Sequence, residues 1–245
     1  MRLHVNRRWN RVIVAPHTLL WCATVVIVAC SSKRVGVGVP VTANQSIRAA
    51  DDIPAGSVAD ADTLLVDLRT LDSSIVVDMR YRGTDNFTGA SLPGYQANRA
   101  FLHRDAARAF ARVQRSLASQ GLGLKVFDAY RPVRATLAMV AWTRRVGRES
   151  LVRDGYISDR SRHNLGVAVD CTLIDRVTGR EFDMGTPFDT FTSAAHTANA
   201  TGIVAENRAR FVAAMKSEGF ANYDQEWWHY SFVVANARRF DVVIR

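Results

Sequence analysis

The sequence has 245 residues, of which 48% are hydrophobic and 22% charged, a composition that excludes a disordered chain and a small disulfide-stapled fold. The formal net charge is +9, but residues 1–50 contain seven Lys or Arg and no Asp or Glu. Residues 51–245 hold the other 25 basic residues against 23 acidic ones, a net charge of +2. Because the basic excess is concentrated near the N-terminus, the charge does not support a nucleic-acid-binding surface.

Residues 1–29 have the pattern of a lipoprotein-type signal peptide. Four arginines precede an apolar run that extends from Val12 to Ala29. The run ends in Ile27-Val28-Ala29-Cys30, which resembles a bacterial lipidation site with Cys30 as the modified residue. A cleaved secretory signal or an uncleaved anchor is the alternative, since the run is just long enough to span a bilayer. We therefore expect an exported, membrane-anchored lipoprotein that faces the periplasm or the cell exterior.

Residues 30–62 are rich in Gly, Ser, Ala, Val and Asp and lack helical periodicity, which predicts a flexible tether. A single folded domain is expected over residues 63–245. Apolar spacing and turn residues predict, in chain order, strands 66–68 and 75–81, a loop 82–100, a helix 104–120, a strand 124–127, a helix 133–146, a strand 167–173, a turn 175–181, a helix 206–218 and a strand 227–234. Strands and helices do not alternate regularly, and this pattern favours the α+β class.

Two segments combine imidazole and carboxylate groups in a way that is typical of metal sites. His163 lies in a polar, glycine-containing loop, and Asp170 follows it within an otherwise apolar strand. A carboxylate among apolar neighbours requires a compensating positive charge, and a zinc ion would supply it. Taken alone, His163 is more simply a loop histidine and Asp170 an acid at a strand end.

The second segment is Glu226-Trp227-Trp228-His229-Tyr230. On an ideal strand Glu226 and His229 would point to opposite faces, so both reach one site only if Glu226 lies at a bend entering the strand. His163, Asp170 and His229 would then provide three protein ligands and leave one position open, as in catalytic zinc sites. Glu226 would remain free to accept a proton from water.

Six blocks of sequence resemble the zinc D-alanyl-D-alanine dipeptidases related to VanX, within the wider group of zinc D,D-peptidases. The resemblance covers roughly residues 64–240 and is carried by Tyr81 with Asp85–Gly89, by Gly94-Tyr95, by Asp128–Pro132, by Ser161–Asp170, by Met184–Asp189 and by Glu226–Tyr230. It implies a small central, mainly antiparallel sheet flanked by helices in a single catalytic domain. Cys171 departs from the aliphatic residue expected there, and we interpret it as a buried small side chain.

The resemblance also implies roles for individual residues. His163, Asp170 and His229 match the ligands of one zinc ion per chain, and Glu226 matches the general base. Arg131 matches an arginine that stabilises the oxyanion, although a surface salt bridge with Asp128 is an alternative. A last group resembles residues of the substrate pocket: Asp189, which would bind the substrate ammonium, with Ser161 and Tyr81 in support. A helix N-cap is the alternative role for Asp189.

The expected activity is hydrolysis of the D-Ala-D-Ala dipeptide by metal-activated water, with Glu226 as the base and the small dipeptide as the partner. No nucleic acid and no obligate protein partner are inferred. A D,D-carboxypeptidase or endopeptidase acting on longer peptidoglycan peptides is the nearest alternative. A catalytically idle wall-binding lipoprotein is disfavoured, because the ligand residues, Arg131 and Glu226 are all present.

Overall fold

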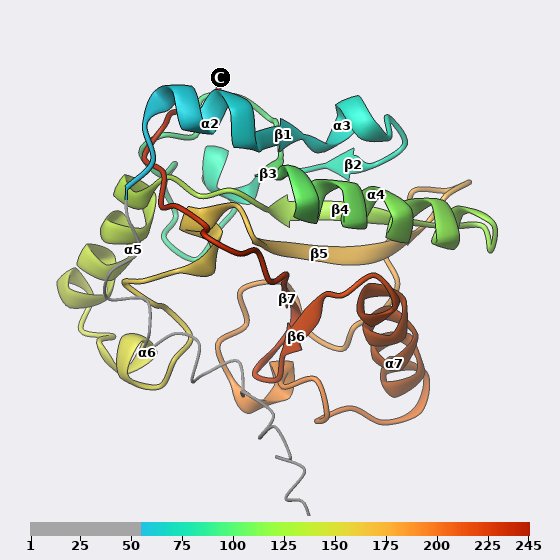
Figure 1. The fold of residues 1–245 in the computed structure, drawn as a ribbon. Coiled ribbons are helices and arrows are strands. Elements are labelled where there is room, and N and C mark those ends of the chain that lie inside the picture. The colour runs from blue at the N-terminus through green and yellow to red at the C-terminus, as the bar shows by residue number, and fades with distance from the viewer. Residues whose placement is uncertain (1–54) are drawn as a thin grey trace, which may run out of the picture. The chain divides into compact units, whose positions relative to one another are not determined.

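The computed structural model describes residues 55–245, and Figure 1 shows their arrangement. A five-stranded sheet has the order β2-β4-β5-β7-β6. Only the β2–β4 pair is parallel, so the expected mainly antiparallel sheet is confirmed. A two-stranded antiparallel sheet, β1-β3, lies beside it. The strands are β1 (Leu65–Asp67), β2 (Val76–Val77), β3 (Phe101–His103), β4 (Leu122–Asp128), β5 (Ala168–Asp175), β6 (Ala221–Tyr223) and β7 (Glu226–Ser231).

Within residues 55–245, six α-helices surround the strands. They are α2 (Val58–Leu64), α3 (Leu68–Leu71), α4 (Arg104–Ala118), α5 (Val133–Arg145), α6 (Ser150–Arg153) and α7 (Gly202–Ser217). Short 3-10 turns occur at η2 (Arg80–Arg82), η3 (Arg162–Leu165) and η4 (Ser193–Ala195). None of the helices within residues 55–245 has the length and apolar character needed to cross a bilayer.

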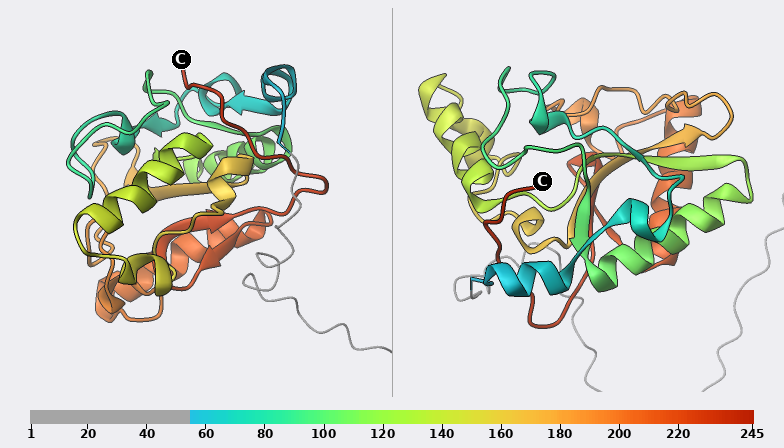
Figure 2. Two further views of the ribbon diagram at one scale, coloured as in Figure 1. Left: turned by 90° about the vertical axis from the view of Figure 1, so that its left-hand side faces the viewer. Right: turned by 90° about the horizontal axis from the view of Figure 1, so that it is seen from above.

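Helices cover one face of the main sheet. Alternation along β5 turns Val169 to this face, and Tyr230 stands opposite Val169 in the neighbouring strand. The Tyr230 ring packs 4.7 Å from that of Phe211 on α7, and Phe110 on α4 packs against Phe220. Figure 2, viewed from above, shows α4 on this side of β4 and β5.

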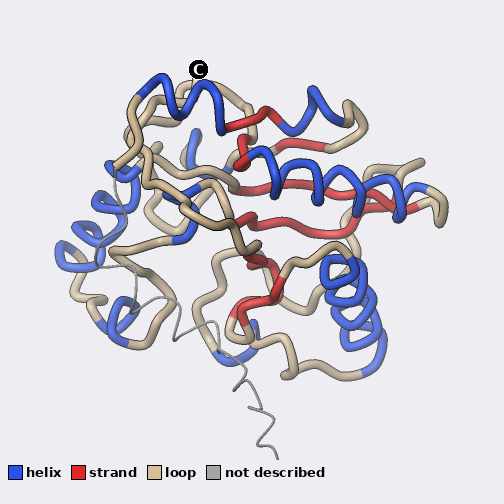
Figure 3. The backbone as a smooth tube through the Cα atoms, in the orientation of Figure 1, coloured by secondary structure: helices blue, strands red, loops and turns tan. Residues whose placement is uncertain are grey.

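Long loops cover the opposite face, to which the same alternation turns Asp170. The connections from η2 to β3 and from β5 to α7 run over this face with little regular structure, as the tan segments of Figure 3 show. Phe188 of the second loop stacks on Phe127 of β4 at 5.0 Å and contacts Trp228 of β7. Between these loops and the strands lies the cavity that is described in the next subsection.

Most predicted elements agree with the observed ones in type and differ in extent, but the predicted strand 75–81 is observed only as β2, and Arg80 and Tyr81 belong to η2. Helix α5 begins directly after Pro132, as expected, whereas α7 begins at Gly202, before the predicted start at residue 206. The short strands β3 and β6 and the short helices α3 and α6 were not predicted. Residues 58–64 form α2, with Ser57 and Asp60 in a capping box, although the sequence predicted a tether through residue 62. Residues 30–54 of the predicted tether and the whole signal peptide lie outside the described residues.

Candidate active site

Three neighbouring strands align the polar groups of the site. Asp128 of β4 pairs with Asp170 of β5, and Asp170 pairs with His229 of β7. Directly opposite residues of adjacent strands project to the same face, so the three side chains form a row across the sheet. A register shift between Val126 and Asp128 brings Asp128 into this row. The sheet therefore joins groups that lie 42 and 59 residues apart in the chain.

The donor atoms of three side chains form a small triangle. His163 Nε2 lies 3.2 Å from His229 Nδ1 and 3.4 Å from Asp170 Oδ1, and His229 Nδ1 lies 2.9 Å from Asp170 Oδ1. Zinc bonds of about 2.0–2.1 Å at tetrahedral angles place donor atoms about 3.3–3.4 Å apart. The triangle is close to that size, and the three residues are the group within residues 55–245 that could hold a metal ion.

The surroundings of His163 fix which ring nitrogen faces the triangle. His163 Nδ1 lies 2.6 Å from the carbonyl oxygen of Ala129, which can only accept, so Nδ1 carries the proton. Nε2 then presents its lone pair to His229 and Asp170. Ser161 caps η3, where its Oγ accepts the backbone N–H of His163, and it also lines the cavity described below. A carbonyl that orients a ligand histidine is the usual arrangement around a metal.

A bulge in β7 brings Glu226 to the same place. Tyr230 pairs with Asn222 of β6, but Glu226 pairs with the next residue, Tyr223, so three residues of β7 have no partner in β6. Asn222 Nδ2 spans this bulge by donating to the carbonyl oxygens of Glu226 and His229, both at 3.0 Å. Glu226 Oε2 consequently lies 3.7 Å from His229 Nδ1. The irregularity expected at Glu226 is thus a bulge that follows it within β7, and not a bend before the strand.

Arg131 is held in a buried network. Its Nε and Nη2 donate to Asp128 Oδ2 at 2.9 and 2.8 Å, and Tyr95 donates to the other oxygen of Asp128 at 2.6 Å. Arg131 Nη2 also lies 3.7 Å from Asp170 Oδ2. The salt bridge considered from the sequence exists, but Asp128 is fully buried and Arg131 is 8% exposed, so the pair is not a surface feature. Asp128 thus orients the guanidinium beside the carboxylate of Asp170.

Asp189 and Tyr81 meet although 108 residues separate them. The Tyr81 hydroxyl donates to both carboxylate oxygens of Asp189, at 3.0 and 3.2 Å. The Tyr81 ring lies under the guanidinium of Arg131, 5.1 Å from its central carbon. Asp189 has a positive φ of 62° and begins no helix, so the N-cap alternative is wrong.

A cavity of about 220 Å³ unites these groups. Its walls include the two histidines, Asp170, the candidate base Glu226 and several aromatic rings. The residues singled out from the sequence that line it are Tyr81, Arg131, Ser161, His163, Asp170, Asp189, Glu226 and His229. Only Cys30, the expected lipidation site, lies outside the described residues.

Burial and neighbouring charges shift the acidic groups of the cavity in opposite directions. Burial raises the pKa of Glu226 well above its usual value, the charges of Asp170 and Asp189 raise it further, and Arg131 opposes them. Burial likewise raises the pKa of Asp189, with Asp170 adding to the rise. For Asp170 burial also acts upward, but the two histidines outweigh it and hold its pKa below the usual value. Asp170 is thus suited to bind a cation, and Glu226 to exchange a proton.

The structure adds residues that sequence reasoning did not assign to the site. Asp128 was considered only as a surface partner of Arg131, although an acid at the end of an apolar strand was a signal of burial. Tyr95 appeared in the family blocks without a role. Asn222, which spans the bulge, gave no signal because the two groups that it joins there are backbone carbonyls.

Comparisons with known proteins agree with this geometry. Residues 61–241 match the Peptidase_M15 family model, described as D-ala-D-ala dipeptidase. The chain is 34% identical over 169 residues to a D-alanyl-D-alanine dipeptidase of Enterococcus faecium, covering 62% of this chain and 83% of the relative. Dipeptidases of the same description from Streptomyces coelicolor (34% over 176 residues, 66% and 87% covered) and Escherichia coli (33% over 173 residues, 69% and 84% covered) are similarly related.

Proposed function

The chain belongs to the M15 peptidase family of D-Ala-D-Ala dipeptidases, and from that premise we propose that it hydrolyses the D-Ala-D-Ala dipeptide as a zinc metallopeptidase with Glu226 as its general base. The observation that carries the proposal is the meeting of three donor atoms, a buried glutamate and Asp189 in one cavity. Family membership gives the substrate class, and the cavity supplies a distinct group for each part of the reaction.

The residues present fit a zinc ion. Two neutral imidazole nitrogens and a carboxylate oxygen are the ligand types that zinc prefers, and their spacing suits a tetrahedral ion with one position left open. Asp170 is 3% exposed, so its charge is costly unless a cation shares the pocket. His163, Asp170 and His229 would hold one zinc ion per chain. When bound, zinc supplies Lewis-acid polarisation of the scissile carbonyl and lowers the pKa of water.

Two side chains of the chain itself then handle protons and charge. Glu226 accepts the proton of the attacking water and returns it to the nitrogen of the leaving D-alanine, a cycle helped by its raised pKa. Arg131 stabilises the negative charge that develops on the carbonyl oxygen. Its Nε and Nη2 are fixed by Asp128, and the side chain that they anchor lines the cavity. A guanidinium oriented before the reaction needs no reorganisation in the transition state.

Asp189 gives the reason for a preference for dipeptides. A free ammonium can pair with its half-buried carboxylate, and the hydrogen bond from Tyr81 holds that carboxylate in place. A preceding residue would convert the ammonium to an amide and leave Asp189 unpaired, which a buried site penalises strongly. Longer peptidoglycan peptides and N-acylated dipeptides should therefore be poor substrates.

The test compares two substrates with and without metal. The full-length enzyme should hydrolyse D-Ala-D-Ala, should lose this activity with a chelator and regain it with zinc, and should cleave N-acetyl-D-Ala-D-Ala far more slowly. Preference for the acetylated substrate would instead support a carboxypeptidase or endopeptidase. Metal analysis on the same preparation should return close to one zinc per chain, and a chain without zinc that hydrolyses neither substrate would contradict the assignment.

We also propose that the enzyme acts outside the cytoplasmic membrane as a lipoprotein anchored through Cys30. The support is sequence alone, namely the arginines and apolar run that precede Ile27-Val28-Ala29-Cys30. Cells that express the chain with radiolabelled palmitate should yield a labelled membrane-bound product, and Cys30→Ala should remove the label. An unlabelled wild-type protein that fractionates with the cytoplasm would refute this proposal.

A further inference from the structure

The segment from Met184 to His196 carries Asp189 but has little structure of its own. It contains the single turn η4 and no strand. Asp189 has φ = 62° and Gly185 φ = 81°, both in the left-handed region that side chains rarely adopt. A conformation of this kind persists only where the surroundings determine it. The position of the Asp189 carboxylate is therefore set by what holds the segment.

One buried arginine of α7 holds both ends of the segment. Arg208 donates from Nε and Nη2 to the carbonyl oxygen of Met184, at 2.9 and 2.6 Å. It donates from Nη2 to Ala194 at 3.0 Å and from Nη1 to the carbonyl oxygen of His196 at 2.7 Å. These four hydrogen bonds use three carbonyl groups that span the stretch containing Asp189. In Figure 1 the segment, drawn in orange, leads from β5 toward α7.

The guanidinium of Arg208 binds backbone carbonyls and not a carboxylate. Its side chain is 2% exposed, and burial lowers its pKa, while Asp183 acts in the opposite direction. No carboxylate of residues 55–245 forms an ion pair with it. A buried cation without a counter-ion is costly, whereas an apolar side chain would fill the same space without that cost. The planar fork of arginine is the group that can reach three carbonyls at once.

The start of the segment packs closely against α7. A Cβ atom added at Gly185 would lie 2.8 Å from Val204 Cγ1 and 3.3 Å from Arg208 Nη2. Asn207, the neighbour of Arg208, donates to the carbonyl oxygen of Asp183 at 2.9 Å. From the other side, Trp227 of β7 donates to Thr186 Oγ1 at 2.8 Å. The segment is thus fixed between α7 and the strand that carries Glu226 and His229.

We propose that Arg208 is a positioning residue for substrate recognition. By binding the carbonyls of Met184, Ala194 and His196, it holds the carboxylate of Asp189 in the position where it can bind the substrate ammonium. Arg208 does not line the cavity and does not touch the reacting atoms. The inference rests on the proposed role of Asp189 in binding the ammonium. It predicts that a change on α7, outside the cavity, alters KM and selectivity for a free amino terminus.

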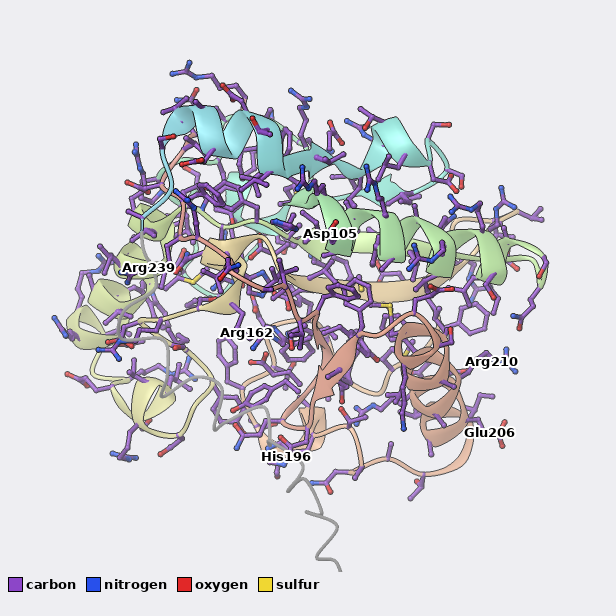
Figure 4. The ribbon with its side chains drawn as sticks, viewed as in Figure 1. Asp105, Arg162, His196, Glu206, Arg210 and Arg239 are labelled. Carbon is purple, nitrogen blue, oxygen red and sulfur yellow. The ribbon has the colours of Figure 1, made fainter. Side chains whose placement is uncertain are left out.

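The experiment compares Arg208→Met and Arg208→Lys with Arg210→Met and Asp189→Asn. Arg210 is exposed on the outer side of the same helix, where Figure 4 labels it, and serves as the matched control. Each zinc-loaded enzyme is assayed for kcat and KM with D-Ala-D-Ala, for the ratio of kcat/KM between this substrate and its N-acetyl form, for zinc content and for Tm.

Arg208→Met should raise KM at least about tenfold, which corresponds to about 1.4 kcal/mol, and should reduce the selectivity ratio with zinc content unchanged. Arg208→Lys keeps the charge without the fork and should lie between Arg208→Met and the wild type, and Arg210→Met should match the wild type. A purely structural role would lower Tm and leave KM and selectivity unchanged. That result, with Asp189→Asn still raising KM, would overturn the proposal for Arg208.

Two further outcomes are distinguishable. If Asp189→Asn also leaves KM and selectivity unchanged, the ammonium-binding role of Asp189 is refuted, and with it the basis of this inference. If Arg208→Met does not fold, Arg208→Lys decides by the same two quantities, and a wild-type KM and selectivity in that variant would contradict the proposal.

Discussion

Asp189→Asn separates substrate binding from stability in one substitution. Asparagine keeps the size of the side chain and one oxygen that can accept the Tyr81 hydroxyl, which lies 3.0 Å from Asp189 Oδ1. It removes the negative charge that would pair with the substrate ammonium. Loss of one member of a buried, hydrogen-bonded charge pair costs about 2–5 kcal/mol. At about 1.4 kcal/mol per factor of ten, kcat/KM for D-Ala-D-Ala should fall between about 30-fold and about 4,000-fold.

The same substitution should stabilise the substrate-free enzyme at neutral pH. Because burial raises the pKa of Asp189, the folded protein binds this proton more tightly than the unfolded chain does. The favourable contribution of the group is complete below the unfolded pKa and is lost as the pH rises through the raised, folded value. Asparagine stays neutral throughout, so the variant should have the higher Tm at pH 8, and the difference should vanish near pH 4.

Steady-state kinetics and scanning calorimetry at both pH values check the two expectations. Asp62→Asn, an exposed carboxylate on α2, is the control and should change neither quantity. A kcat/KM within about threefold of the wild-type value would refute the ammonium-binding role, since a neutral amide cannot replace an ion pair of this kind. A lower Tm for Asp189→Asn at pH 8 would refute the argument from burial.

Three other substitutions or treatments test the rest of the site. Glu226→Gln should lower kcat by about 10²–10⁴-fold with zinc content unchanged, since it removes the proton acceptor and none of the three ligands; retained turnover would exclude Glu226 as the base. Zinc at about 1,000 times its Kd should stabilise the metal-free protein by about 4 kcal/mol, which corresponds to a rise in Tm of roughly 8–16 °C for a chain of this size. In a thermal melt, His229→Ala should abolish that rise. Gly185→Ala should lower the free energy of unfolding, measured in urea, by about 1–3 kcal/mol more than Gly179→Ala does. Gly179 is the control because its φ of 72° is similar but an added Cβ there would meet open space. Equal losses in the two variants would show that contact with Val204 is unimportant.

The amino-acid sequence by itself determined the chemistry of the site. Histidine, aspartate and glutamate are the residue types that bind zinc and move protons near neutral pH, so His163, Asp170, Glu226 and His229 stand out in apolar or glycine-containing segments. The strands and helices that carry them were also predictable in type, because the apolar period is a local property of the chain. The same periodicity predicted an irregularity at Glu226, because Glu226 and His229 would point to opposite faces of a regular strand.

Only the tertiary structure decided how these groups meet. The row of Asp128, Asp170 and His229 depends on strand register, and the position of Glu226 depends on a bulge spanned by Asn222; both arise from pairing between distant segments. The place of Asp189 is set by Tyr81 and by the four hydrogen bonds of Arg208 to the surrounding segment. Backbone carbonyls are the same in every residue, so a sequence pattern contains no sign of which ones a buried arginine will bind.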